Sequence, residues 1–185
     1  MRFTRNRIPV ATAVGYPDGS STTAAKLYEG RDLLRRGARE IEMLPNIGKL
    51  LSRQFQYIET ELMQMAKSCL EEGVTFKVSL GRFALPDDLK IITLKIAKRI
   101  EAAYFSLPYQ PASLALLTPL LKERISLRAA GGVINLDLAL QARDGGCARI
   151  ATAQTAAILD AWKSKLAPKE VEQGTDASPG NGMIS

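Results

Sequence analysis

The sequence predicts an α/β protein of (β/α) TIM-barrel type, with six consecutive strand–helix units in residues 10–165. Short apolar strands alternate with amphipathic helices, and this alternation builds a parallel sheet. Doubly wound sheets show the same strand–helix alternation. A barrel is favoured because several strands carry a polar residue near the carboxyl end, where barrels place inward-pointing polar groups. Each such residue could equally be a structural pairing inside a packed barrel. They are Glu42, Lys77, Ser106, Arg128 and Thr152.

The first three units are bounded by residues that begin or end helices. Gly37 ends the first helix, Ser52 is expected to cap the second, and Pro86 opens the third, where its missing N–H costs nothing. In the second helix an apolar stripe recurs at three- and four-residue steps, as one buried face requires. The elements are strand 10–16, helix 22–36, strand 39–44, helix 53–72, strand 75–80 and helix 86–101.

The last three units contain the first indication of a ligand site. The strand ISLRAA runs into Gly131-Gly132 and then into a helix, and two glycines let backbone N–H groups approach an anion near a helix N-terminus. We therefore expect a phosphate cradle there. The elements are strand 102–107, helix 111–122, strand 125–130, helix 136–144, strand 147–152 and helix 154–165.

The two ends of the chain differ in composition from its middle. Residues 1–9 carry Arg2, Arg5 and Arg7, and we interpret them as a solvated basic arm. The segment 166–185 is polar and rich in Gly, Pro and Ser, which predicts a disordered tail. The net charge of +6 is otherwise diffuse, and no nucleic-acid motif accompanies it, so we expect no nucleic-acid partner.

Composition also restricts the chemistry and the location. The chain has no histidine, which removes the commonest general base and metal ligand, so we expect no metal. Cys69 and Cys147 lie in different elements and are interpreted as reduced thiols of a cytoplasmic protein. No apolar run approaches the ~18 residues of a membrane span, and no secretory signal is present at the start.

Four stretches together point to a known family. Segment 10–50 contains VGYPDGSSTTAAK followed by EIEMLPNIG, and it is the most specific of the four. FKVSLG (76–81), LRAAGGVINLDLAL (127–140) and GCARIATAQTAAIL (146–159) follow in the same order. With these motifs the chain resembles the 2-deoxyribose-5-phosphate aldolase family over about residues 10–160.

The resemblance implies a (β/α)8 barrel that works through a lysine Schiff base, without metal or cofactor. At the position of the Schiff-base lysine this chain has Ser106, and a hydroxyl cannot form an imine. At the second active-site lysine it has Arg128, which stays protonated and is no substitute nucleophile. The catalytic aspartate corresponds to Glu42, which keeps the carboxylate but moves it by one methylene.

Positions that the family uses for ligands are only partly retained. Ala153 and Gln154 stand where the phosphate-binding serines are expected. Lys26, Gly131 and Gly132 are retained, and we take these three as the candidate phosphate or ligand site. A phosphorylated small molecule is therefore a candidate ligand.

The number of units is a second departure from the family. Six of the usual eight strand–helix units are recognised, and only nine residues precede the first. The first and sixth strands would then be exposed edges, which attract partners. Either the chain closes differently, or self-association or a protein partner covers the edges, or the true start lies upstream.

The residues support one leading function and one alternative. We expect a catalytically inactive aldolase-like protein that acts as a binding, scaffold or subunit protein. The alternative is an active class I aldehyde-lyase with Lys77 as a relocated nucleophile, which should point into the barrel near Ser106 and Arg128. Against this alternative, Lys77 would instead be a paired lysine, for example with Glu42.

Overall fold

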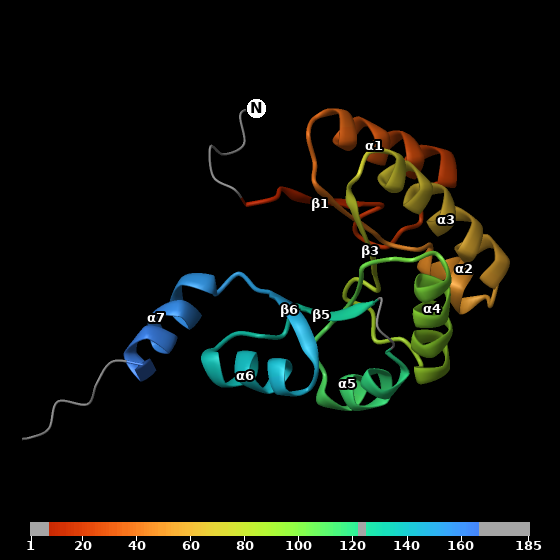
Figure 1. Cartoon of the computed structure of the whole chain (residues 1–185). Helices are drawn as coiled ribbons and strands as arrows, with labels where there is room; N and C mark the ends of the chain where they lie inside the picture. Colours follow the sequence, from red (N-terminus) through yellow and green to blue (C-terminus); the bar gives the residue numbers. More distant parts are fainter. Residues whose placement is uncertain (1–7, 122–124, 167–185) are drawn as a thin grey trace, which may run out of the picture.

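Six parallel strands form one curled sheet in the order β1-β2-β3-β4-β5-β6, with helices on its outer side (Figure 1). The computed structural model describes residues 8–121 and 125–166. Each strand pairs with the next one in the chain, so the predicted α/β, TIM-barrel-like arc of six units is confirmed. The strands are β1 (Ala11–Val14), β2 (Glu40–Met43), β3 (Thr75–Ser79), β4 (Tyr104–Leu107), β5 (Ser126–Ala130) and β6 (Cys147–Ala151).

The helices follow the predicted order, with additions. They are α1 (Thr23–Arg35), α2 (Ile47–Leu51), α3 (Phe55–Glu71), α4 (Asp87–Arg99), α5 (Pro111–Leu117) with a 3-10 turn (Thr118–Leu120), α6 (Leu136–Asp144) and α7 (Thr155–Leu166). Arg2, Arg5 and Arg7 lie outside the described residues, as does the predicted tail 166–185 except Leu166, which is the last residue of α7.

The helix boundaries differ from the prediction at four places. The short helix α2 was not predicted; Asn46 caps it, with its side chain accepting from Lys49 N–H at 3.0 Å. Ser52 is the C-cap of α2, and α3 begins three residues after it without a side-chain cap, so the predicted cap was wrong. Pro86 is the N-cap of α4 and not its first residue. After α5, Pro119 lacks the N–H of an α-helix and the last turn is 3-10.

The core lies between the outer face of the sheet and the helices. Successive strand side chains point to opposite faces, and one set is apolar and fully buried, as Ile41, Val78 and Phe105 are. The strand side chains that point to the inner face are instead polar. The stripe predicted for α3 packs against the apolar set. Its residues are Phe55, Ile58, Leu62, Met65 and Cys69.

Helix α7 packs only loosely against the rest of the protein. It lies beyond β6 at the edge of the sheet, next to α6 (Figure 1), and none of its residues is buried. Its side chains Leu159 and Leu166 are more than half exposed. Over the described residues, no helix is both long and apolar enough to cross a membrane.

We predict that Gly19→Ala destabilises the protein far more than Gly37→Ala. Both glycines have positive φ, of +69° and +94°. A Cβ at Gly19 would lie 2.0 Å from the carbonyl oxygen of Pro45, whereas one at Gly37 would meet nothing within 4 Å. Strain alone costs about 1–2 kcal/mol, and the backbone clash should add about 2 kcal/mol at Gly19. Urea unfolding of both variants checks this, and equal losses would contradict it.

Candidate functional site

The candidate catalytic residues meet on the inner face of the sheet. Arg128 on β5 forms an ion pair with Glu42 on β2, although two strands lie between β2 and β5. The same Nη1 also donates to Ser106 Oγ at 3.2 Å. Ser106 is fully buried. The three positions that the resemblance assigns to catalysis therefore come together, and they form one closed hydrogen-bonded set.

Lys77 belongs to a second set on the same face. Its ammonium contacts Glu40, and Arg149 Nη1 lies 2.7 Å from the other oxygen of that carboxylate. The Tyr104 ring lies beside both cations, with its centroid 5.8 Å from Lys77 Nζ and 4.3 Å from the guanidinium carbon of Arg149. Lys77 is only 2% exposed. This set joins β2 to β3 and β6.

The expected partner of Lys77 was wrong. Sequence reasoning suggested Glu42, which is level with Lys77 in the strand register, but the ammonium contacts Glu40. Glu42 is already paired with Arg128. Sequence reasoning also missed Glu40 and Arg149. A signal for Glu40 was available, because it lies two residues before Glu42 on the same strand and so shares its face.

Two cations decide the protonation of Glu40. Its burial alone would raise the pKa of the carboxyl, but hydrogen bonds and charge from Lys77 and Arg149 outweigh burial and hold the pKa below its usual value. Glu40 is therefore ionised at neutral pH. Its lowered pKa also means that the folded protein gains stability from this carboxylate above the pKa of an unfolded glutamate.

The glycine pair does adopt a conformation that favours glycine, with φ of +90° and +80° at Gly131 and Gly132. The Gly131 N–H donates to the carbonyl oxygen of Ala151, and its own carbonyl accepts from Tyr109 N–H, both at 3.1 Å. A Cβ at Gly132 would lie 3.3 Å from the Tyr109 carbonyl oxygen. These glycines thus allow three loops to pack together, and one of the expected anion donors is already used.

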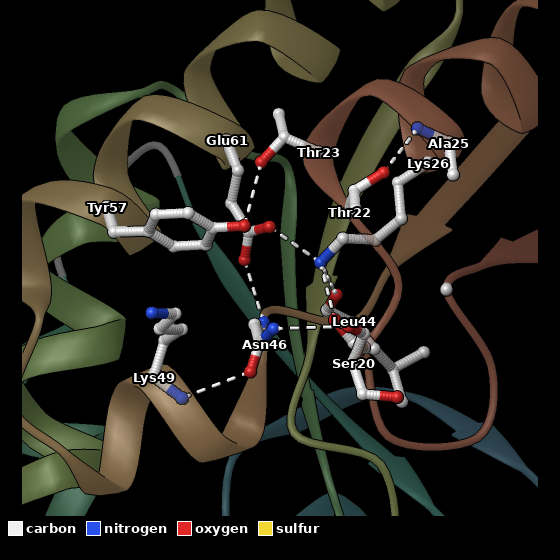
Figure 2. A network of polar contacts seen from close by, with 12 residues as sticks. Ser20, Thr22, Thr23, Ala25, Lys26, Leu44, Asn46, Lys49, Tyr57 and Glu61 are labelled. Atoms are coloured by element: carbon white, nitrogen blue, oxygen red, sulfur yellow. Dashed lines mark hydrogen bonds and ion pairs between the residues drawn. The ribbon is translucent and has the colours of Figure 1, made fainter.

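Lys26 is the third candidate ligand residue, and it is fully buried (Figure 2). Its ammonium lies 2.6 Å from Glu61 Oε2 and donates to the carbonyl oxygens of Gly19 and Leu44 at 2.9 and 3.2 Å. The other oxygen of Glu61 accepts from Asn46 N–H at 2.7 Å. Burial raises the pKa of Glu61, and Lys26 and the Asn46 N–H oppose that rise.

This network connects the loop after β1 to the loop after β2. All the donors of Lys26 are used inside the protein, so we do not include it in the ligand site proposed below. The polar contacts of Lys26 go to Glu61, Gly19 and Leu44, and none of them joins it to Glu42, Ser106 or Arg128. Across the described residues, no three His, Cys, Asp or Glu side chains gather as a metal site requires.

We predict that Glu40→Gln lowers the free energy of unfolding at pH 7. We also expect the variant to lose less of that free energy than the wild type as the pH is lowered further. Removing one partner of a buried ion pair leaves the others uncompensated and costs about 3 kcal/mol. Because the pKa of Glu40 is lowered, its stabilisation is present above the unfolded pKa of about 4.3 and is lost as pH falls through the folded value.

Urea unfolding between pH 7 and pH 3 measures both effects. The matched control is Glu59→Gln, which removes the pair between Glu59 and the exposed Arg99. We expect the control to keep the acid response of the wild type. A Glu40→Gln variant with the same loss of stability between pH 4.5 and pH 3 as the wild type would contradict the assignment.

Comparison with known proteins identifies the family. A deoxyribose-phosphate aldolase from Bacteroides thetaiotaomicron is 31% identical over 163 residues, which are 84% of this chain and 68% of that protein. One from Dictyoglomus turgidum is 29% identical over 161 residues, or 83% of this chain and 73% of that protein. No protein-family model matches the chain.

Solved structures agree on the fold. QR15, described as an aldolase, aligns with a TM-score of 0.80 and 20% identity over 86% of this chain and 75% of that one. The deoxyribose phosphate aldolase from Aeropyrum pernix, described as tetrameric, aligns with a TM-score of 0.75 and 22% identity over 86% and 70%. Given the identity to the Bacteroides protein over two thirds of its length, this chain belongs to the deoxyribose-phosphate aldolase family.

Proposed function

We propose that this protein is a catalytically inactive member of its family that acts by binding. The contact of Arg128 with both Glu42 and Ser106 is the observation that carries the proposal. It supports a structural use of the three positions that the resemblance assigns to catalysis. A group that is to react with a substrate has to be free to leave its protein partners, and these groups are held by one another.

The chemistry of the residue types supports the same conclusion. A Schiff-base aldolase needs an amine that is neutral near pH 7. Position 106 carries a hydroxyl, which forms no imine, and position 128 carries a guanidinium, which remains protonated. The covalent route of the family therefore has no nucleophile at either of its two lysine positions.

Lys77 is the nucleophile of the alternative proposal, an active lyase. A nucleophilic amine has to be free to approach the substrate carbonyl. Lys77 contacts Glu40 and is buried beneath Tyr104, so a substrate carbonyl would first have to displace both. This geometry favours the inactive protein over the lyase, and a trapping experiment separates the two.

Binding would involve the open edges of the sheet. β1 and β6 end the strand order, and each has one neighbour among the described strands. Beside β6, a groove of about 290 Å³ between α6 and α7 is lined mostly by apolar residues, which include Ile150 and Trp162, and also by Arg143 and Arg149. We propose self-association through this edge. The tetrameric description of the Aeropyrum pernix structure is consistent with it.

We also propose a cytoplasmic location. Cys69 and Cys147 are both free and buried, and burial raises the pKa of the Cys69 thiol to about 12. Cysteines that remain unpaired and unreactive are compatible with a reducing compartment.

We predict no aldol cleavage of 2-deoxyribose 5-phosphate by the purified protein. Without the covalent route, turnover should not exceed the rate in buffer, and borohydride with acetaldehyde should give no adduct beyond the nonspecific alkylation of surface amines that a Lys77→Ala variant also shows. An active aldolase of the family serves as the positive control. If borohydride traps an adduct that Lys77→Ala abolishes, the alternative nucleophile is correct and the proposal of an inactive protein fails.

We predict that the protein self-associates and that Leu159→Glu weakens the association at least tenfold. Leu159 lies on α7, lines the groove beside β6 and is half exposed, so a carboxylate there would be buried on association. Tyr28→Glu, an exposed position on α1, is the matched control and should leave the association unchanged. Light scattering over a dilution series measures this, and a monomer at every concentration would refute the prediction.

A further inference from the structure

Two arginines lie side by side on the inner face of the sheet. Arg128 of β5 and Arg149 of β6 are partners in the strand register. The register shifts by one residue just before this pair, between Leu127 and Arg128, so that Arg149 and not Ala148 lies beside Arg128. Such a bulge re-aims a side chain, and here it brings a second guanidinium to the inner face.

Each guanidinium is already held in one orientation. Arg128 contacts Glu42 and Ser106 through Nη1, and Arg149 contacts Glu40 through Nη1 while its plane lies over the Tyr104 ring. Donors fixed in this way lose little further freedom when they bind a ligand.

The remaining N–H groups are only partly used. Every hydrogen bond from Arg128 and Arg149 to Glu42, Ser106 and Glu40 comes from Nη1. Hydrogen bonds with Glu40 and, to a smaller extent, with Tyr104 raise the pKa of Arg149. The side chains are 16% and 42% exposed, so part of each guanidinium is open to solvent. Nε and Nη2 form the fork with which arginine binds a carboxylate or phosphate through two parallel bonds.

The two arginines start close enough to share one ligand. Arg128 and Arg149 are register partners on neighbouring strands, which lie about 4.8 Å apart. One oxyanion can lie between the guanidiniums of two side chains that start at that separation, with N–H···O distances of about 2.8 Å to each.

The charge balance of this face is positive. Lys77, Arg128 and Arg149 are opposed by Glu40 and Glu42, which leaves one positive charge among these inner-face residues. A concave surface with a charge of one sign concentrates ions of the other sign.

We propose that Arg128 and Arg149 together bind a small molecule that carries an oxyanion, either a phosphate or a carboxylate. This site deepens the proposed function, because it gives the inactive protein a ligand at the position where the resemblance would place a catalytic lysine. It is distinct from the Gly131-Gly132 loop, where the N–H of Gly131 is already bonded. If this site does not bind an anion, the separate proposal that the protein lacks lyase activity is not affected.

Titration of the full chain with inorganic phosphate, and separately with malonate, tests the site at constant ionic strength. Calorimetry and the unfolding temperature both report saturable binding, and comparison of the two anions distinguishes the phosphate from the carboxylate source. We expect Arg149→Gln to weaken the binding of the preferred anion at least tenfold. Arg143→Gln, an exposed arginine paired with Asp144, is the matched control and should change binding less than twofold.

A second pair of variants is designed to remain folded while losing the anion site. Arg128→Gln is combined with Glu42→Gln, so that no carboxylate is left unpaired, and Arg149→Lys keeps the charge but loses the fork. Both should remain folded by circular dichroism and should bind at least tenfold more weakly. No saturable binding of either anion by the wild type would overturn the proposal, as would equal binding by wild type and the folded variants.

Discussion

The ion pairs that Glu40 and Glu42 form across the inner face hold this fold in its curled shape. Backbone hydrogen bonds connect each strand only to its neighbours, whereas Arg128 and Arg149 connect β5 and β6 directly to β2. A carboxylate removed from water is stable only when it is paired, so these contacts are required by the burial of the two glutamates. These ion pairs therefore connect strands that are not neighbours in the six-stranded arc across its inner face.

This constraint also explains how the site departs from the chemistry of the family. Arginine has a planar fork that can satisfy several acceptors at once, and the Nη1 of Arg128 serves both Glu42 and Ser106. A lysine would offer a point charge at that position and a nucleophile when neutral. Arg128 joins Glu42 and Ser106 in the inner-face network, and under the proposal of an inactive protein it stands where a reactive amine would be needed. The N–H groups on Nε and Nη2 are what these arginines can offer to a ligand.

The sequence predicts the strand–helix order and the buried stripe of α3 well, because both depend on local periodicity. It misses α2, which has five residues and is too short to show a period. It does not identify the partner of Lys77, because Glu40 and Glu42 share a face and only the three-dimensional stagger of the strands selects between them. Arg149 is missed since a register shift turns it inward. Lys26 looks like a ligand residue until α3 brings Glu61 to it from 35 positions away.

A double-mutant cycle on Arg128 and Glu42 tests the central claim most directly. The free energies of unfolding of Arg128→Gln, Glu42→Gln and the double variant, measured in urea at pH 7, give the coupling between the two side chains. If the ion pair holds β5 to β2, each single variant loses stability and the double variant recovers more than about 1 kcal/mol of the summed loss. Losses that add to within about 0.5 kcal/mol would show that the two residues act independently and would contradict the account.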